Sequence, residues 1–532
     1  MAYVIGMDFG TLSARAVLAD TETRHVHARS VSTYASGIMD RFLPDGREAM
    51  PGTALQRPED YLSAMTECIQ KLLEHGGVEN EEIAGLSMDF TCTTCLPVDA
   101  QLQPLSGAYP DRGEAMIKLW KHHAAEEARE LTDMLRRRGV AWLDMSGGRL
   151  SAEWLAPKLL QTARRDAEVY ERMDAYMEAG DWLISLLVGE KVRSLSYALY
   201  KNLYQEGFPR GMFAEVESEY AGFEHRLFDG RVVPVLGMAG RLCPEMARKL
   251  SLPEGMPVGA GLTDSHTPVL QVGGIQDGDV VSILGTSACH LLQSGTLKCL
   301  GGVAGLARDG IVPGLTSYEI NHSFGEILAW HLNQAVPEDV FRQAEEQGRQ
   351  GQAYLVQEAL KLPPGAGGLM ALPWFNGDRC LLSDPDLTGM ILGLRLNTTP
   401  YQVCRALMEA VCMSVRQCLE HLETGGLHIG RVIATGGVAH KSPGMMQLLA
   451  DILGRPVLVS RCEEGSAQGS ALVASVMSGV HADVEKASAA MAEKEVTELK
   501  PVQAGAYEEI YARYRELAGY FGRESRIMHE LR

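Results

Sequence analysis

The sequence predicts an α/β protein made of two related halves, and three stretches of residues lead to this prediction. Residues 4–20, VIGMDFGTLSARAVLAD, give an apolar run, a polar turn on glycine and a second apolar run, which is the pattern of a strand hairpin. Residues 280–292, VVSILGTSACHLL, repeat this pattern in the second half of the chain. Residues 431–457 then give a strand, a Gly-Gly turn and an amphipathic helix. A hairpin that recurs near the start of each half indicates a duplicated architecture.

Length, composition and charge set the limits of this prediction. The 532 residues suffice for two or more domains, and 46% hydrophobic with 22% charged residues is typical of a globular protein. A formal net charge of −19 disfavours nucleic acid as a partner, because binding its phosphates usually requires a basic surface. The sequence has no apolar run of about 18 residues, so we expect no membrane span and no membrane partner.

The first residues and the cysteines lead us to expect a cytoplasmic location. The sequence enters a strand pattern at once, without the basic and apolar regions of an export signal. Its 11 cysteines are scattered and odd in number, which favours free thiols in a reducing compartment. Cys92 and Cys95 form a lone Cys-x-x-Cys pair without further zinc ligands nearby, so we interpret them as two small residues in a loop.

The first hairpin carries residues suited to a phosphate. Gly10, Thr11 and Ser13 form a tight polar turn, and such turns direct backbone N–H groups and hydroxyls at an anion. Asp8 ends the preceding strand, where a carboxylate suits a divalent cation that rides on a phosphate, usually through water. An ordinary hairpin with a solvated aspartate is the alternative, and this stretch alone leaves it open.

Two further turns fit a nucleotide. The second hairpin turns on Gly285, Thr286 and Ser287, as the first turns on glycine and hydroxyls. Gly436 and Gly437 follow a strand and precede a helix start, where backbone can approach a ligand closely. The Gly-Gly turn is equally compatible with simple packing. After it, the small residues of 464–471 allow a helix to pack closely against a neighbour.

Asp264 is the candidate general base. It ends a strand of small residues just before the second hairpin, and a carboxylate on a rigid strand end beside a phosphate site can accept a proton from an incoming hydroxyl. The alternative is that Asp264 caps a helix N-terminus, a position that aspartate favours. We expect His266, His290 and His322 to be packed or hydrogen-bonded histidines rather than metal ligands.

Taken together, these residues resemble the FGGY family of carbohydrate kinases. The resemblance rests on residues 8–11 (DFGT), 285–287 (GTS), 436–437 (GG) and 261–264 (GLTD), and it extends from residue 3 to about residue 520. A second set of stretches is similar to the family members that phosphorylate L-ribulose to L-ribulose 5-phosphate in arabinose catabolism. These stretches are 88–91 (MDFT), 118–123 (KLWKHH), 151–154 (SAEW), 374–377 (WFNG) and 393–395 (GLR).

The resemblance implies a fold of two actin-like (ribonuclease H-like) domains with an interdomain cleft. It places the sugar mainly on residues 1–258 and ATP mainly on residues 259–532. The last helix, about 505–525, carries an apolar face, and we consider that it packs back on the first domain. ATP, Mg²⁺ and a ketopentose are the implied ligands, and a homodimer is compatible with the resemblance.

The resemblance also implies a role for each motif residue. Asp264 matches the catalytic base, and Asp8 matches the aspartate that helps to hold Mg²⁺ as an indirect ligand, through water. The phosphates would lie against both hairpins and adenosine against the Gly-Gly turn, which gives as cofactor-binding residues Thr11, Ser13, Arg15, Gly285, Thr286, Ser287, Gly436 and Gly437. The residues matched to sugar contacts, besides the base, are Thr91, Cys92, Trp120, Lys201 and Glu319.

Two departures from the family pattern concern the sugar. Cys92 replaces a smaller residue in the sugar loop, and Ile320-Asn321-His322 is bulkier than the usual sequence after the glutamate. Three functions therefore stay open: a kinase of L-ribulose, a kinase of another ketopentose or polyol such as D-ribulose or L-xylulose, and an actin-like nucleotide-binding protein without a sugar substrate.

Overall fold

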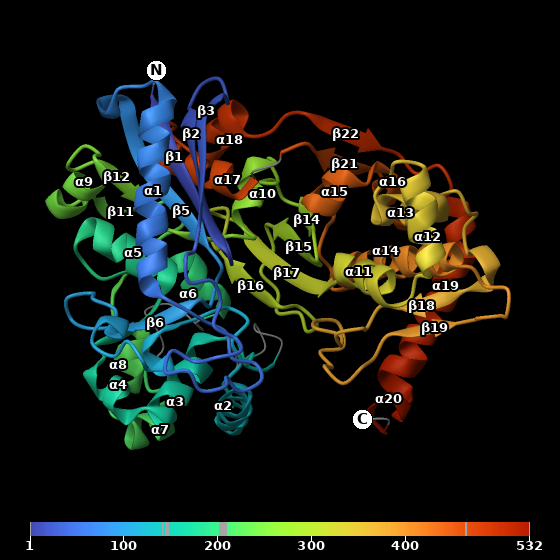
Figure 1. Cartoon of the computed structure of the whole chain (residues 1–532), viewed down its shortest axis with the longest axis horizontal. Coiled ribbons are helices and arrows are strands. Elements are labelled where there is room, and N and C mark those ends of the chain that lie inside the picture. Colours follow the sequence, from blue (N-terminus) through green and yellow to red (C-terminus); the bar gives the residue numbers. More distant parts are fainter. Residues whose placement is uncertain (1, 141–142, 144–147, 202–209, 463–464, 531–532) are drawn as a thin grey trace. The chain divides into compact units, whose positions relative to one another are not determined.

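The computed structural model describes residues 2–140, 143, 148–201, 210–462 and 465–530, and its contacts divide the chain into two units (Figure 1). Unit 1 comprises Met1–Ile275, Gly305–Ser317 and Glu464–Ala492, and unit 2 comprises Gln276–Ala304, Tyr318–Glu463 and Glu493–Arg532. This division differs from the predicted boundary at residue 258, because the chain stays in unit 1 to Ile275 and later returns to it twice.

Unit 1 is built on a twisted sheet that begins with the predicted hairpin. β1 and β2 pair antiparallel with Asp8 opposite Arg15, and the Gly10 amide donates to the Ser13 carbonyl across the turn at 3.0 Å. β5 and β13 lie parallel to this first strand and to each other. The sheet order is β11 (Met238–Arg241), β12 (Pro257–Gly259), β5 (Ile83–Phe90), β1 (Tyr3–Phe9), β2 (Ser13–Asp20) and β3 (Val26–Thr33), with β13 (Leu262–Thr263) also on β5.

In its described part, unit 1 also contains two smaller sheets and a set of helices. A second sheet has the order β4 (Leu55–Gln56), β7 (Ile117–Lys118), β6 (Cys95–Val98), β8 (Ala175–Glu178), and β9 (Val192–Ser194) pairs with β10 (Arg231–Val233). The other elements are α1 (Pro58–Gly76), α2 (Ala125–Arg137), α3 (Leu155–Arg165), α4 (Ala167–Arg172), α5 (Ala179–Val188), α6 (Leu195–Lys201), α7 (Ala214–Glu219), α8 (Phe223–Phe228), α9 (Pro244–Leu250), α10 (Thr267–Gln271), β16 (Gly305–Arg308), α17 (Gly465–Met477) and α18 (Val484–Met491).

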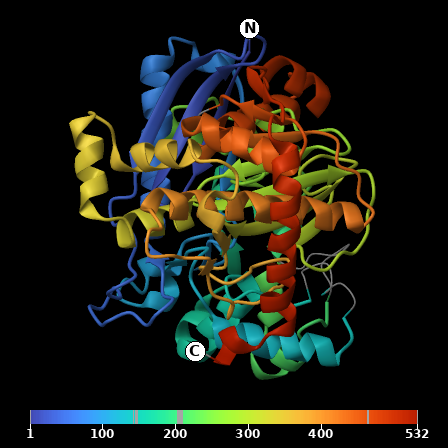
Figure 2. The same cartoon turned by 90° about the vertical axis from the view of Figure 1, so that its right-hand side faces the viewer.

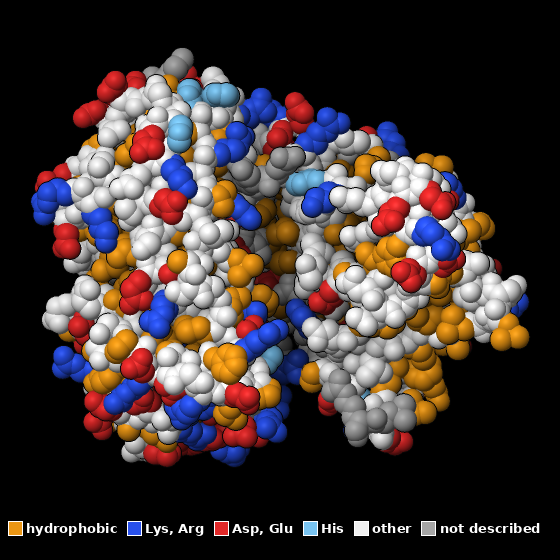
Figure 3. Space-filling model, in the orientation of Figure 1, with side chains coloured by type: hydrophobic (Ala, Val, Ile, Leu, Met, Phe, Trp, Pro, Cys, Tyr) orange, Lys and Arg blue, Asp and Glu red, His pale blue; other side chains and the backbone are white. Residues whose placement is uncertain are grey.

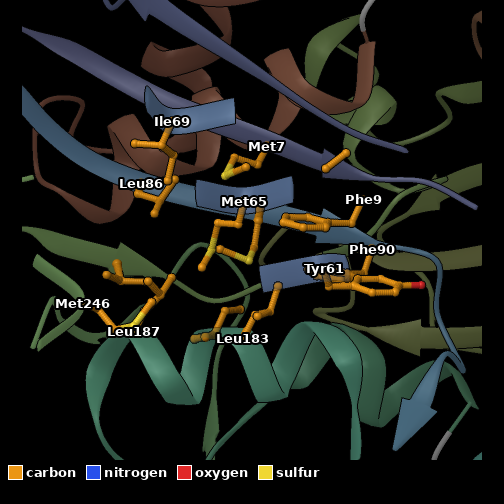
Figure 4. Close-up of a cluster of buried hydrophobic side chains, with 14 of the residues drawn as sticks. Met7, Phe9, Tyr61, Met65, Ile69, Leu86, Phe90, Leu183, Leu187 and Met246 are labelled. Carbon is orange, nitrogen blue, oxygen red and sulfur yellow. The ribbon is translucent and has the colours of Figure 1, made fainter. Parts of the chain in front are cut away.

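The two faces of the unit 1 sheet carry different side chains, because successive residues of a strand point to opposite faces. Met7 and Phe9 of β1 and Leu86 and Phe90 of β5 point into the main hydrophobic core, together with side chains of α1 and α5 (Figure 4). The rings of Phe9 and Phe90 stack with their centroids 4.2 Å apart. Because successive side chains of a strand point to opposite faces, Asp8 and its neighbours on β5 point to the other face, which α17 covers.

The second predicted hairpin opens the sheet of unit 2. β14 and β15 pair antiparallel, and β14 pairs parallel with β20, as the duplicated architecture predicts. The strand order in this unit is β17 (Thr316–Ser323), β15 (Ser287–Ser294), β14 (Val280–Leu284), β20 (Val432–Thr435), β21 (Val457–Ser460) and β22 (Val496–Leu499). The other elements are α11 (Gly325–Gln334), α12 (Glu338–Glu346), α13 (Gly351–Leu360), β18 (Met370–Leu372), β19 (Met390–Leu392), α14 (Pro400–Thr424), α15 (Gly437–Lys441), α16 (Pro443–Leu453), α19 (Ala504–Gly519) and α20 (Ile527–Glu530).

Two long helices of unit 2, α14 and α19, pack against each other. α14 begins at Pro400 because Thr399 and Gln402 form a capping box around the first turn. α19 presents Tyr507, Tyr511 and Tyr514 as a buried stripe. It packs against α14 and α16 within unit 2, and Figure 2 shows this red helix running across the orange α14. The contacts therefore assign the last long helix to unit 2, within the predicted second domain.

The surface carries mixed charges, and the cysteines are free, as the sequence predicts. Acidic and basic side chains are interspersed on the face in Figure 3 rather than gathered by sign. None of the described helices has the length and apolar character needed to cross a membrane. All 11 cysteines are free thiols. Cys92 lies in the predicted loop, but Cys95 opens β6, where burial raises the pKa of its thiol to about 11 and makes a redox role unfavourable.

α17 approaches the sheet closely, as its small residues predict. A Cβ atom on Gly6 of β1 would lie 2.0 Å from the Ala467 carbonyl oxygen of α17. A Cβ atom on Gly469 of the same helix would lie 2.3 Å from the Thr267 carbonyl oxygen. Both clashes are with backbone atoms, so neither glycine tolerates a side chain unless the helix moves.

We expect Gly6→Ala to destabilise the protein by about 1–3 kcal/mol or more, because the new methyl group overpacks a rigid backbone contact. Gly107→Ala is the control, since its Cβ would meet nothing within 4 Å. Urea unfolding followed by circular dichroism compares the two variants with the parent. Equal midpoints for Gly6→Ala and Gly107→Ala would contradict the close packing of α17.

Candidate active site

Three aspartates gather at one edge of the unit 1 sheet. Asp8 and Asp89 are direct neighbours across the parallel strands β1 and β5. Asp264 follows β13, whose last residue, Thr263, pairs with Phe90 of β5. The carboxyl ends of parallel strands meet at the same edge of a sheet, and this edge is where α/β proteins commonly bind ligands.

Asp8 is buried and partly neutralised by a neighbouring guanidinium. Its Oδ2 lies 3.5 Å from Nη1 of Arg15 on the facing strand β2. Burial raises the pKa of the Asp8 carboxyl, and hydrogen bonding to Asp89 and the charge of Arg15 oppose this increase. An oxygen donor of this kind suits Mg²⁺, a hard cation that is usually bound by one or two carboxylates and keeps several waters.

Asp89 is a polar residue of this site that our sequence analysis did not single out. Its side chain is fully buried, and the Ser470 hydroxyl of α17 donates to its Oδ2 at 2.6 Å. Burial, and then the charge of Asp8, hold its pKa well above the ordinary value. The signal was present in the sequence, because Met-Asp-Phe occurs both at 7–9 and at 88–90.

Asp264 is fixed by its backbone and does not cap a helix. Its amide donates to the Phe90 carbonyl at 2.8 Å, and the backbone carbonyl of Asp264 accepts from the Ser466 hydroxyl of α17 at 3.1 Å. Its Oδ1 accepts from the Ser265 amide at 2.7 Å. The N-cap of α10 is His266, so the capping alternative is wrong. The carboxylate is therefore held at a strand end, as a general base requires.

The predicted sugar and phosphate residues of unit 1 are linked through Trp120. Its indole nitrogen donates to the Thr11 hydroxyl at 3.1 Å, and its amide donates to the Thr94 hydroxyl at 3.2 Å. The hydroxyls of Thr91 and Thr94 lie 2.7 Å apart. Trp120 thus joins the turn after β1 to the loop after β5.

The other predicted residues of unit 1 lie nearby in the chain. Ser13 opens β2 at the end of the hairpin turn. Cys92 is buried in the loop after β5, with its sulfur 4.0 Å from Oε1 of Glu178. Lys201 ends α6, but its side chain lies outside the described part of the chain.

In unit 2 the two predicted glycine turns lie side by side. Ile283 of β14 pairs with Thr435 of β20, so the turns that follow these parallel strands are adjacent. The Gly285 amide donates to the Ser287 carbonyl at 3.0 Å, and the Thr286 carbonyl accepts from the amides of residues 324 and 326. Gly436 has φ 97°, and a Cβ atom there would lie 2.8 Å from the Leu284 carbonyl oxygen. Only glycine fits at 436, and Gly437 then begins α15.

Glu319 lies on β17 with a buried side chain. Its Oε1 accepts from the Asn321 amide group at 2.6 Å, so the departure at 320–322 provides a direct partner for this carboxylate. The two residues can meet because they are two positions apart on β17 and therefore lie on the same face of the strand.

His290 and His322 form a hydrogen-bonded pair beneath this face. Nδ1 of His322 lies 2.9 Å from the Ser323 carbonyl, which can only accept, so Nδ1 carries the proton. Nε2 of His322 therefore accepts from Nε2 of His290 at 2.9 Å, and Nδ1 of His290 accepts from the Ser282 hydroxyl at 2.8 Å. Burial lowers the pKa of both rings, to about 4 for His322. The expectation of hydrogen-bonded side chains is confirmed for His290 and His322.

Comparison with protein families identifies both parts of the chain. Residues 3–270 match the N-terminal domain of the FGGY family of carbohydrate kinases, and residues 280–478 match its C-terminal domain. The chain belongs to this family. It is therefore a phosphotransferase with an alcohol acceptor, and this membership favours the kinase interpretation over the actin-like binding protein without a substrate.

Relatives of this FGGY kinase cover its whole length. It is 35% identical to a ribulokinase from Geobacillus thermodenitrificans, over 100% of this chain and 96% of that protein. It is 36% identical to a ribulokinase from Halalkalibacterium halodurans, over 98% and 95%. A crystal structure of xylulose kinase from Rhodospirillum rubrum covers 99% of this chain and is itself covered fully, with a TM-score of 0.79 at 24% identity. This likeness confirms the two-domain α/β fold.

The histidine pair predicts a specific pH dependence of stability. The pKa of His322 is about 4 in the folded kinase and near 6.5 in an unfolded chain, so the unfolded state binds more protons between these values. Stability should therefore fall by about 3 kcal/mol as the pH is lowered from 6.5 to 4. We expect His322→Gln to flatten this dependence, measured as the urea midpoint at several pH values, while exposed His428→Gln leaves it unchanged. An equally steep dependence in His322→Gln would assign the effect to other groups.

Proposed function

We propose that this FGGY kinase transfers the γ-phosphoryl group of ATP to the 5-hydroxyl of L-ribulose. The observation that carries the proposal is full-length identity of 35–36% with proteins named ribulokinase. Two of the stretches that carry the ribulokinase resemblance, 88–91 and 118–123, lie in unit 1. D-ribulose and L-xylulose are the competing substrates, because Cys92 and the segment 320–322 depart from the family pattern.

In this proposal Asp264 is the general base. Its carboxylate accepts the proton of the sugar hydroxyl as the oxygen attacks the γ-phosphorus, and the bond from phosphorus to the bridging oxygen of ADP breaks. The hydrogen bonds that fix the backbone of Asp264 to β5 and α17 support this role, because they hold the carboxylate on a rigid strand end. Positioning accounts for much of phosphoryl transfer, since its transition state is loose and the base mainly orients the nucleophile.

The two hairpins and the Gly-Gly turn are the proposed nucleotide contacts. The proposed phosphate contacts are Thr11, Ser13 and Arg15 of the first hairpin and Gly285, Thr286 and Ser287 of the second. Gly436 and Gly437 would lie against adenosine. Asp8 would hold Mg²⁺, usually through water, and bound Mg²⁺ would neutralise charge on the phosphate oxygens.

The proposed sugar contacts are Thr91, Cys92, Trp120, Lys201 and Glu319, together with the base. Thr91 and Trp120 belong to one hydrogen-bonded assembly, which supports their common role. We further expect a cytoplasmic enzyme, which the free thiols support, acting on small molecules rather than on nucleic acid. A homodimer is compatible with this proposal.

We expect Asp264→Asn to lower kcat by about 10²–10⁴-fold, because it removes the proton acceptor while preserving size. ATP binding, followed by calorimetry, and the urea midpoint should stay close to those of the parent. Asp111→Asn, a change at an exposed aspartate, is the matched control for the loss of one charge. A variant that keeps more than a tenth of the parent turnover would remove Asp264 from the role of base.

Among ketopentoses, we expect L-ribulose to have the highest kcat/KM. Stereoisomers differ only in where their hydroxyls point, and a buried polar group left unpaired costs about 1–3 kcal/mol. The measurement is phosphorylation of L-ribulose, D-ribulose, L-xylulose and D-xylulose at sub-saturating concentrations with ATP and Mg²⁺. If another ketopentose ranks above L-ribulose, the substrate assignment fails and the broader assignment as a pentulose kinase remains.

A further inference from the structure

We propose that Lys158 is a positioning residue that ties the loop of residues 91–94 to the segment 118–123 and so orders the sugar-binding surface of unit 1. This inference rests on the proposed function for what the surface binds, but the tie itself is a feature of the fold. None of the roles proposed above includes Lys158, and its ammonium does not belong to the aspartate cluster.

The contacts of Lys158 define the tie. Its Nζ donates to the Thr93 carbonyl at 2.7 Å and to the Leu119 carbonyl at 2.7 Å. The side chain has no exposed surface, and among the described residues its hydrogen bonds go to backbone oxygens rather than to a carboxylate. Burying an ammonium without an ion pair is costly, and burial accordingly lowers its pKa. The two hydrogen bonds to the Thr93 and Leu119 carbonyls offset part of this cost.

The backbone at Thr93 is the part of the loop that needs this support. Thr93 has φ 67°, the left-handed region, which β-branched residues rarely adopt and which costs of the order of 1–3 kcal/mol. Thr93 is buried, so the residues packed around it hold it in this conformation. The bond from Lys158 to its carbonyl is one of the contacts that impose it.

The two tied carbonyls flank the proposed sugar contacts. Thr93 directly follows Cys92, and Leu119 directly precedes Trp120. Trp120 in turn reaches Thr94 through its amide and Thr11 through its indole. Loss of the two Lys158 hydrogen bonds would therefore loosen both the loop 91–94 and the segment 118–123. It would leave the glycine turns of unit 2 unchanged.

A second buried lysine provides the matched control. Lys118 is as buried as Lys158, but its Nζ forms an ion pair with Glu114 and donates hydrogen bonds to Gln161, to Thr162 and to the Lys158 backbone carbonyl at 3.2 Å. It makes no hydrogen bond to the loop 91–94 among the described contacts. Lys118→Met therefore removes a buried charge from the same region without releasing the loop.

The kinetic test compares Lys158→Met with Lys118→Met. We expect Lys158→Met to raise KM for the ketopentose by roughly 10-fold or more while KM for ATP stays within about 2-fold, because contacts to a misplaced loop are lost. Lys118→Met should lower the urea midpoint without this separation of the two KM values. Lys158→Gln, which keeps a shorter N–H donor, should fall between Lys158→Met and the parent. Equal sugar KM values in Lys158→Met and Lys118→Met, or no recovery in Lys158→Gln, would overturn the proposal.

A measurement without substrate separates this inference from the proposed function. Amide hydrogen exchange, followed by mass spectrometry, should become faster in peptides covering 91–95 and 118–122 of Lys158→Met or, if that variant does not fold, of Lys158→Gln. The peptide covering 91–95, which does not contain the substituted residue, should be unchanged in Lys118→Met. Faster exchange with a kinase that phosphorylates no ketopentose would retain the tie and reject the function. Unchanged exchange would reject the tie whatever the enzyme's activity.

Thr93→Gly adds a test of the strain itself. Glycine adopts the left-handed conformation without cost, so the loop should depend less on Lys158 in this background. We expect the rise in sugar KM caused by Lys158→Met to be several-fold smaller in the Thr93→Gly protein than in the parent. A rise of the same size in both backgrounds would show that Lys158 does not act through Thr93.

Discussion

The close approach of α17 to β1 and β5 is the constraint on which the rest of unit 1 depends. Gly6 permits it, because any side chain there would strike the backbone of the helix. Once the helix lies this close, Ser470 can reach Asp89 and Ser466 can reach the backbone of Asp264. The helix thus supplies polar partners to a face of the sheet that is otherwise shut off from water. Without Ser470, the buried Asp89 carboxyl group would lose its hydrogen-bond donor while it lies beside the charge of Asp8.

The fold was predictable to the extent that local patterns determine it. Both hairpins, the Gly-Gly turn with its helix and the close-packed helix at 464–471 follow from runs of apolar, small and turn-forming residues. The division of the chain was not predictable in this way. It depends on which surfaces α17 and α19 cover, and their apolar faces say only that each helix packs somewhere. Residue 258 marks a strand in sequence, whereas the contacts keep the following residues to Ile275 in unit 1.

The candidate site shows the same limit. Asp8 and Asp264 could be proposed because each ends a strand next to a turn that suits phosphate. Asp89 lies inside an apolar strand, and its importance depends on the register that places it beside Asp8. In the sequence, Lys158 is one of several basic residues in the stretch that forms α3. It differs from the others in its complete burial and in its two hydrogen bonds to backbone carbonyls. Residues whose role depends on a distant partner are therefore the ones that a single sequence conceals.

The route of the chain has a consequence for how the protein is made. Unit 1 includes residues before Ile275 and residues after Glu464, with most of unit 2 between them. A ribosome releases the N-terminal part first, so β1 and β5 leave it long before the helix that covers their polar face. Until then, Asp89 and the groove around Gly6 stay open to solvent. The N-terminal unit therefore cannot mature as an independent domain during synthesis, and its completion must wait until nearly all of the other unit has emerged.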